Sequence, residues 1–140
     1  MIYALSALFL TLNLYAQNPL ADKVRDLIPE PTRSSTIPKT KLSSVLSKLG
    51  KAALVEKNNY YWIISGHKYG LHMRFDKNLL SYVHYNFVAP KPSIEKLKGI
   101  VDLEKFKSTS AKTEYLVYEK DNIVITINPV DKTIYSVTIK

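Results

Sequence analysis

The fold is decided by residues 40–87, which read TKLSSVLSKLGKAALVEKNNYYWIISGHKYGLHMRFDKNLLSYVHYNF. Near its start, four apolar residues have the spacing of one helical face: Leu42, Val45, Leu46 and Leu49. Thr40 is a suitable N-cap, and Gly50 suits the left-handed position that ends a helix. We therefore predict a helix over residues 40–49.

Three strands are predicted after this helix. The run from Tyr60 to Ile64 is aromatic and β-branched, a composition typical of strands. Beyond it, apolar Leu71 and Met73 alternate with polar His72 and Arg74, the pattern of a half-buried strand. Turn residues separate the segments, and we place the strands at residues 59–65, 69–75 and 80–87.

The same plan recurs in the second half of the chain. Ser93 can cap a second helix, with Ile94, Leu97 and Val101 on its inward side. Three further strands are predicted at residues 115–118, 123–127 and 134–139. We therefore predict an α+β fold with tandem helix–three-strand repeats, residues 40–88 and 89–140, that form one antiparallel sheet with the helices on one face.

The N-terminal segment has the character of an export signal. Ile2 to Ala16 carry no charge, and the run is shorter than the roughly twenty apolar residues that span a bilayer. Leu14-Tyr15-Ala16 is an acceptable cleavage site. We predict a signal peptide over residues 1–16, and hence a secreted or periplasmic protein. A helix buried in the fold is the alternative.

Residues 17–39 are predicted to lead into the domain as a short helix and a Pro/Ser-rich linker. Leu20, Val24 and Leu27 lie on one helical face, and the prolines at 29 and 31 end that helix. The segment Ser34-Ser35-Thr36 is then expected to be extended.

The formal charge of +8 is distributed unevenly. Nine basic residues face two acidic ones between Arg33 and Lys77, whereas nine face seven from Asn78 onward. This asymmetry indicates an acidic protein, a polyanion or an anionic membrane surface as partner, with a merely solvated surface as the plain alternative. The residues that would bind a polyanion are Lys39, Lys41, Lys48, Lys51, Lys57 and Lys68.

The alternation of the strands also predicts one aromatic and basic sheet face. If Met73 and Val83 point inward, His72 lies opposite His84 on the outward face. One helix for every three strands leaves this face open, and aromatic residues with Arg are typical of binding hot spots. Tyr61 and Trp62 compete for the adjacent strand's outward position. The predicted partner-binding residues are Tyr61, Trp62, His72, Arg74, Tyr82 and His84.

No catalytic or cofactor motif is present in the sequence. There is no cysteine, no phosphate-binding glycine loop and no G-x-S-x-G elbow. His72 and His84 could share a metal ion, but a third ligand is available only from His67 or Asp76, without a metal-ligand spacing. A pH-sensitive contact is the easier interpretation of this pair. We predict no enzymatic activity, no cofactor and no metal site.

Part of the chain resembles a known superfamily. Leu46 to Lys51 close the helix, Tyr61-Trp62-Ile63-Ile64 follow, and then Leu71-His72-Met73-Arg74-Phe75-Asp76. This is similar to the BamE-like (SmpA/OmlA) and β-lactamase-inhibitor-like (BLIP-like) superfamily, whose motif is a helix ending in Leu-Gly, a Trp/Tyr strand and an L-x-x-x-F-D strand. The resemblance implies protein–protein contact through the sheet face and no chemistry. Lys51 replaces the usual proline, and the lipobox cysteine of the outer-membrane members is absent.

Together these patterns predict a non-enzymatic protein-binding module, inhibitor-like or envelope-associated, that uses its open aromatic and basic face. Its partner is expected to be another exported or envelope protein. The alternative is a polyanion or envelope-surface binding protein acting through the basic first repeat. Nucleic acid is not expected, because the basic residues are not concentrated on one helix and export separates the chain from it. After processing, the chain is not expected to span a membrane.

Overall fold

The computed structural model describes residues 18–108 and 115–140. Its strands are β1 (Leu54–Glu56), β2 (Asn59–Ile64), β3 (His67–Asp76), β4 (Leu79–Asn86), β5 (Lys107–Ser108), β6 (Leu116–Lys120), β7 (Ile123–Ile127) and β8 (Ile134–Ile139). Its helices are α2 (Pro19–Leu27), α3 (Leu42–Leu49) and the 3-10 turns η1 (Arg33–Ser35), η2 (Ile94–Leu97) and η3 (Leu103–Lys105). The predicted signal peptide, residues 1–16, lies outside the described residues.

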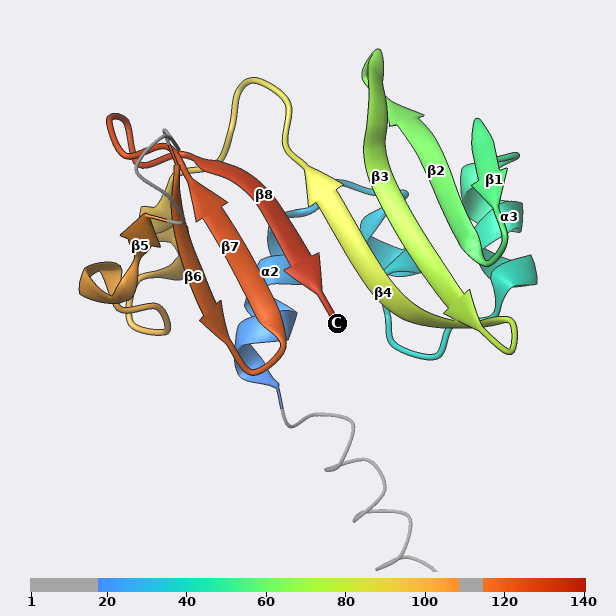
Figure 1. Ribbon diagram of the computed structural model, residues 1–140, viewed down its shortest axis with the longest axis horizontal. Helices are drawn as coiled ribbons and strands as arrows, with labels where there is room; N and C mark the ends of the chain where they lie inside the picture. Colours follow the sequence, from blue (N-terminus) through green and yellow to red (C-terminus); the bar gives the residue numbers. More distant parts are fainter. Residues whose placement is uncertain (1–17, 109–114) are drawn as a thin grey trace, which may run out of the picture.

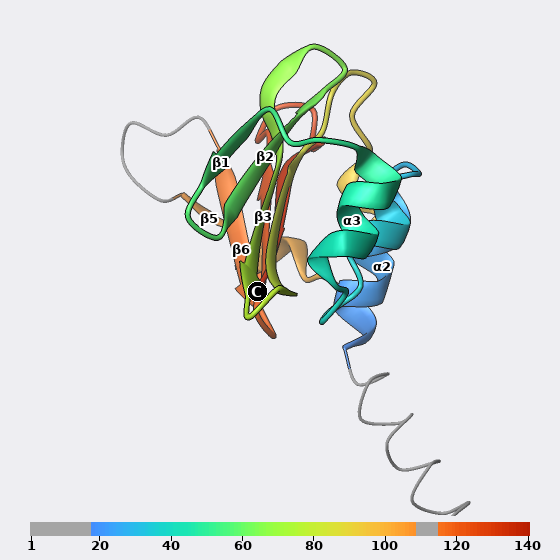
Figure 2. The same cartoon turned by 90° about the vertical axis from the view of Figure 1, so that its right-hand side faces the viewer.

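The strands form one eight-stranded antiparallel sheet in the order β1-β2-β3-β4-β8-β7-β6-β5 (Figure 1). Each half of the chain adds its strands in sequence, and the two halves meet where β4 pairs with β8. Both α-helices lie on the same side of the sheet (Figure 2). The predicted α+β class, with one antiparallel sheet and helices on one face, is confirmed. Across residues 18–108 and 115–140, no helix has the length and apolarity to span a membrane.

The core lies between the helices and the inner face of the sheet. Alternation along the strands sends every second side chain inward, as in β7, where Ile123, Ile125 and Ile127 are buried and the two residues between them are half-buried. The largest fully buried side chains from the other elements are Val24, Ile28, Val45, Leu71, Met73, Ile94, Leu97, Ile134 and Val137.

The prediction of a helix after Ser93 is wrong. Ser93 does cap a turn, accepting from the Glu95 N–H at 3.2 Å, but the turn is only the 3-10 segment η2. Gly99, with φ of +88°, follows it and is unsuited to a continuing helix. The predicted inward residues Ile94, Leu97 and Val101 are nevertheless buried. The apolar pattern was therefore informative about burial but not about helix formation.

Helix α2 occupies the place where that second helix was expected. Figure 1 shows α2 behind β7 and β8, and the Asn18 side chain connects its start to the β6–β7 turn by donating to the Asp121 carbonyl at 3.0 Å. Asn18 also caps the helix by accepting from the Ala21 N–H at 3.0 Å. The N-terminal leader is thus part of the core, with Leu20 and Val24 buried.

The linker that follows α2 is folded rather than extended, contrary to the prediction. The Arg33 N–H donates to the Pro29 carbonyl at 3.0 Å and the Ser35 N–H to the Thr32 carbonyl at 2.9 Å, which winds the segment into η1. Thr32, Ser35 and Thr36 are buried. The hydroxyls of Ser35 and Thr36 donate back to nearby carbonyls, Ser35 to Pro31 at 3.4 Å and Thr36 to Arg33 at 2.7 Å. No buried side-chain polar atom is left unpaired among the described residues.

Trp62 belongs to the inner face, so its predicted place among the open-face residues is wrong. It pairs with buried Leu71 in the β2–β3 ladder and is only 4% exposed. Its indole Nε1–H donates to the Gly50 carbonyl at 3.0 Å, which ties β2 to the end of α3. Since side chains alternate along a strand, the neighbouring Tyr61 takes the outward position.

Replacing Trp62 with Phe is expected to lower the free energy of unfolding by about 1–3 kcal/mol, because the bond to Gly50 is lost and the buried ring becomes smaller. Urea denaturation followed by far-UV circular dichroism measures this change. Ile63→Ala is the matched control, since Ile63 is the next residue of β2 and is 53% exposed. It should change stability by less than about 0.5 kcal/mol. Equal losses in the two variants would contradict the burial of Trp62.

Candidate partner-binding face

The sheet face opposite the helices carries five of the predicted partner-binding residues. We call Tyr61, His72, Arg74, Tyr82 and His84 the open-face cluster. The register pairs Tyr61 with His72, His72 with His84, and Arg74 with Tyr82. The predicted opposition of His72 and His84, with Met73 and Val83 inward, is confirmed. Among the described residues no helix covers this face (Figure 2).

Three rings of the open-face cluster, those of Tyr61, His72 and Tyr82, contact one another across three strands. The Tyr61 and His72 rings are 4.4 Å apart and inclined by 12°, and the Tyr82 ring lies 5.0 Å from His72 at 54°. The Arg74 guanidinium carbon lies 5.1 Å from the Tyr82 ring centroid, within the range of a cation–π contact. These contacts order four large side chains before any partner arrives. Ordered side chains lose less conformational entropy on binding than free ones.

Polar neighbours fix both histidine rings. Nε2 of His72 lies 2.9 Å from Asn59 Oδ1, and an amide oxygen only accepts, so this nitrogen carries the proton. Nε2 of His84 lies 3.2 Å from Asn86 Oδ1, and its Nδ1 lies 2.7 Å from Thr138 Oγ1, whose hydroxyl can donate. One neutral tautomer of each ring therefore satisfies these hydrogen bonds.

The environment of the pair opposes protonation. Partial burial lowers the pKa of His72, and the nearby His84 and Arg74 lower it further. Burial also lowers the pKa of His84, against a smaller opposing contribution from its bond to Asn86. Both rings are therefore neutral at pH 7. In residues 18–108 and 115–140, no group of three or more His, Asp or Glu side chains is placed to hold a metal ion.

The alternative site consists of the six lysines predicted to bind a polyanion. Those that the structure describes do not form one patch. Lys39 and Lys41 lie beside β4, where the Lys39 N–H donates to the Leu80 carbonyl at 3.0 Å and Lys41 bridges to Leu79. Lys57, in the β1–β2 turn, lies near the same end of the sheet, because the adjacent Asn58 donates to Asp76 Oδ1 at 3.1 Å.

The other lysines of that set are at the opposite end of α3. Lys48 is in its last turn and Lys51 follows its C-cap. A helix of eight residues is about 12 Å long, which separates these two from the lysines beside β4. The side chain of Lys68 lies outside the described residues. All five described lysines are exposed, and none of them forms an ion pair within the described residues.

Three site residues were missed by sequence reasoning. Asn59, Asn86 and Thr138 hold the histidine rings in place. Asn86 follows His84 by two residues and therefore lies on the same face of β4. The alternation of side chains along the strand could have predicted this position. Thr138 reaches His84 only through the β4–β8 pairing, across 54 residues of sequence. No local pattern predicts that pairing.

Comparisons with known proteins add little to this geometry. No protein-family model matches the chain, and no curated protein matches it. Among solved structures, the chain is similar to a cysteine-rich secretory protein from Staphylococcus aureus, with 13% sequence identity and a TM-score of 0.44. The match covers 71% of this chain and 43% of that one, so the chain spans less than half the length of that protein. A likeness this weak carries no argument about fold or function.

The histidine environment predicts that stability falls in mild acid. The folded-state pKa of each ring is below the unfolded value of about 6.5, so the unfolded chain binds more protons between those two values. The stabilising contribution of neutral histidine is fully present above about pH 6.5 and is lost as pH falls toward the folded pKa. The midpoint of urea denaturation should therefore decrease between about pH 7.5 and about pH 5. These two values lie about one unit above and about 1.5 units below the pKa of histidine in the unfolded chain.

The variant His84→Gln should flatten this pH dependence, because glutamine keeps hydrogen-bonding capacity without a titrating ring. His67→Gln, in the exposed β2–β3 hairpin, is the control. If the urea midpoint of His84→Gln depends on pH as steeply as that of the unmodified chain, His84 is not a source of the pH dependence.

Proposed function

We propose that this chain is a non-enzymatic protein-binding module whose open-face cluster captures another exported or envelope protein. The observation that carries the proposal is the ordered stack of Tyr61, His72, Tyr82 and Arg74 on a sheet face without a covering helix in the described residues. Tyrosine and arginine are enriched among residues that dominate binding energy. Here Tyr61, Tyr82 and Arg74 are held together by ring and cation–π contacts across three strands.

The charges on this face favour an acidic partner. Arg74 is exposed, and its guanidinium forms no ion pair within the described part of the chain. The register places Glu119 on the same face, in the row that runs through Val124 and Thr138, but its carboxylate is engaged by Lys140 at 3.1 Å. With a formal net charge of +8, the chain should associate fastest with a surface that presents carboxylates.

The resemblance of residues 46–76 to the BamE-like and BLIP-like superfamily supports the same proposal. That superfamily binds proteins through its sheet face, and the tandem layout of its inhibitor members corresponds to two halves that meet between β4 and β8 here. The second half lacks an α-helix of its own among the described residues, so only the strand order follows the tandem plan. Secretion or a periplasmic location is part of the proposal and rests on the apolar N-terminal segment.

A second candidate function is binding of a polyanion or an anionic envelope surface through the first-repeat lysines. The exposed Lys39, Lys41 and Lys57, near one end of the sheet, favour it. It is the weaker candidate, because the remaining described lysines of that set are at the other end of α3.

Site-specific photocrosslinking in the producing cell tests the proposal. With p-benzoylphenylalanine in place of Tyr82, we expect one discrete adduct, because that ring contacts both His72 and Arg74 in the cluster. The control position is Ser47, which is exposed on α3, on the opposite side of the sheet. It should give no such adduct. The same adduct from both positions would contradict a role for the open face.

The partner identified in this way then allows a quantitative test. The variants Arg74→Ala and Tyr82→Ala should each weaken binding about tenfold or more, because each removes part of the ordered stack. Their free energies of unfolding should change by about 1 kcal/mol or less, because both side chains lie outside the core. Isothermal titration calorimetry and urea denaturation measure the two effects. Unchanged affinity in both variants would contradict the proposed site.

A further inference from the structure

A lysine-lined hollow opens at the other edge of the sheet, beside β5 and β6. Strand β5 has only two residues, which pair Lys107 with Val117 and Ser108 with Leu116. Before Lys107 the chain leaves the ladder as the 3-10 turn η3, so the outer edge of β6 from Tyr118 onward has no strand partner among the described residues. A hollow of about 700 Å³ lies at this edge.

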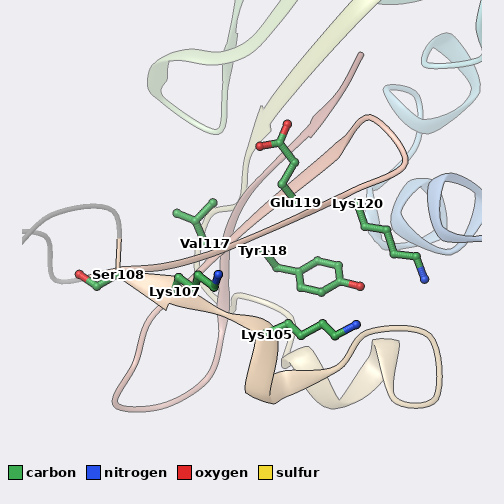
Figure 3. A pocket seen from close by; sticks show the side chains of 7 residues that line it. All are labelled: Lys105, Lys107, Ser108, Val117, Tyr118, Glu119 and Lys120. Atoms are coloured by element: carbon green, nitrogen blue, oxygen red, sulfur yellow. The ribbon is translucent and has the colours of Figure 1, made fainter.

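Three lysines line this hollow. Lys105 comes from η3, Lys107 from β5 and Lys120 from the end of β6. Figure 3 shows the side chains of Lys105 and Lys120 and the Tyr118 hydroxyl extending toward the same side. Lys107 pairs with Val117, which alternates with Tyr118 along β6, so it lies at the other end of the hollow and on the other face of the strand. The Tyr118 ring stacks on Phe106, with their centroids 5.1 Å apart, and the residue is 4% exposed. This packing fixes the position of the ring that carries the hydroxyl.

No carboxylate neutralises these lysines in the described part of the molecule. Glu119 lines the hollow, but Figure 3 shows its carboxylate directed away from Lys105 and Lys120, and it is bridged by Lys140 at 3.1 Å. None of the three lining lysines forms an ion pair with a described residue. Like charges gathered around one hollow create a positive potential that an anion relieves.

From these observations we propose that the hollow binds a phosphate-type oligoanion. Lys105 and Lys120 neutralise its charge, the Tyr118 hydroxyl donates to an oxygen, and Lys107 adds positive potential from the other end of the hollow. Lysine is a point-charge donor to phosphate. The volume lies in the range of small-molecule sites and exceeds a single phosphate, so a ligand with two or more phosphate groups fits it best. Since all three lysines are exposed, the affinity is modest and falls with added salt.

This site is independent of the open-face cluster. Three strand-to-strand steps separate β6 from β4, the nearest strand of the cluster, or about 14 Å at the usual spacing. An anion in the hollow therefore leaves Tyr61, His72 and Tyr82 free to meet a protein partner. The two proposals can fail separately.

Titration of the isotope-labelled protein with sodium pyrophosphate, followed by amide NMR at low ionic strength, tests the site. We expect saturable shifts concentrated in residues 105–108 and 117–120. The triple variant Lys105→Gln, Lys107→Gln, Lys120→Gln should bind about tenfold or more weakly. The matched control is Lys39→Gln, Lys41→Gln, Lys57→Gln, which removes the same charge elsewhere and should bind like the unmodified chain.

Three results would overturn the proposal: equal weakening in both triple variants, no weakening in either, or shifts that centre on Lys39 and Lys41. No weakening in either variant would exclude Lys105, Lys107 and Lys120 as ligands. Shifts that centre on Lys39 and Lys41 would favour the first-repeat surface. Because all six substituted lysines are exposed, thermal unfolding should be the same for both variants, which separates loss of binding from loss of fold.

A second arm uses long-chain polyphosphate in place of pyrophosphate and identifies the source of the anion. Tighter binding that is lost in the Lys105/Lys107/Lys120 variant supports a polymer as ligand. Equal affinity for the two probes, again lost in that variant, supports a small free phosphate compound.

Discussion

The pairing of β4 with β8 is the interaction on which the rest of the structure depends. It joins two sets of strands that are each built from local hairpins, and its register runs from Val83 opposite Ile139 to Asn86 opposite Ser136. On the inner side it brings Tyr85 against Val137, both buried. Closing a contact over more than fifty residues costs chain entropy, which burial of apolar surface beneath both halves offsets. Helix α2 contributes to that burial from the N-terminal end of the chain, behind β7 and β8.

The same pairing produces the site on the outer side. Thr138 is a residue of the second half that fixes His84 of the first, and His84 in turn faces His72 and the stacked tyrosines. A sheet that ended at β4 would present an unpaired edge beside this cluster, and such an edge invites non-specific pairing. Continuing the sheet through β8 and β7 leaves a broad, ordered face. The short final strand β5 then creates a different opening at the far edge, and there the exposed side chains are lysines rather than aromatic residues.

Local patterns were enough to predict much of this architecture. Strands β7 and β8 match their predicted limits, and α3 and β2–β4 agree to within two residues, because alternation and turn residues mark them plainly. Strand parity also placed His72, Arg74 and His84 on one face. It could not choose between Tyr61 and Trp62, since the outcome depends on the contact of the indole with Gly50, at the end of a helix. The position of α2, the β4–β8 joint and the hollow beside β6 all depend on contacts between distant segments, which composition and periodicity do not encode.

Oxidative footprinting of the aromatic residues, in the producing cell and on the purified chain, tests the central claim most directly. The account predicts that Tyr61, Tyr82 and His72 are modified in the purified protein and protected in the cell, where a partner covers them. Tyr135, which is 37% exposed and is not part of the open-face cluster, should be modified in both states. Equal modification of Tyr61 and Tyr82 in both states would contradict a partner on this face. Protection already present in the purified chain would show that the face is covered by the protein itself.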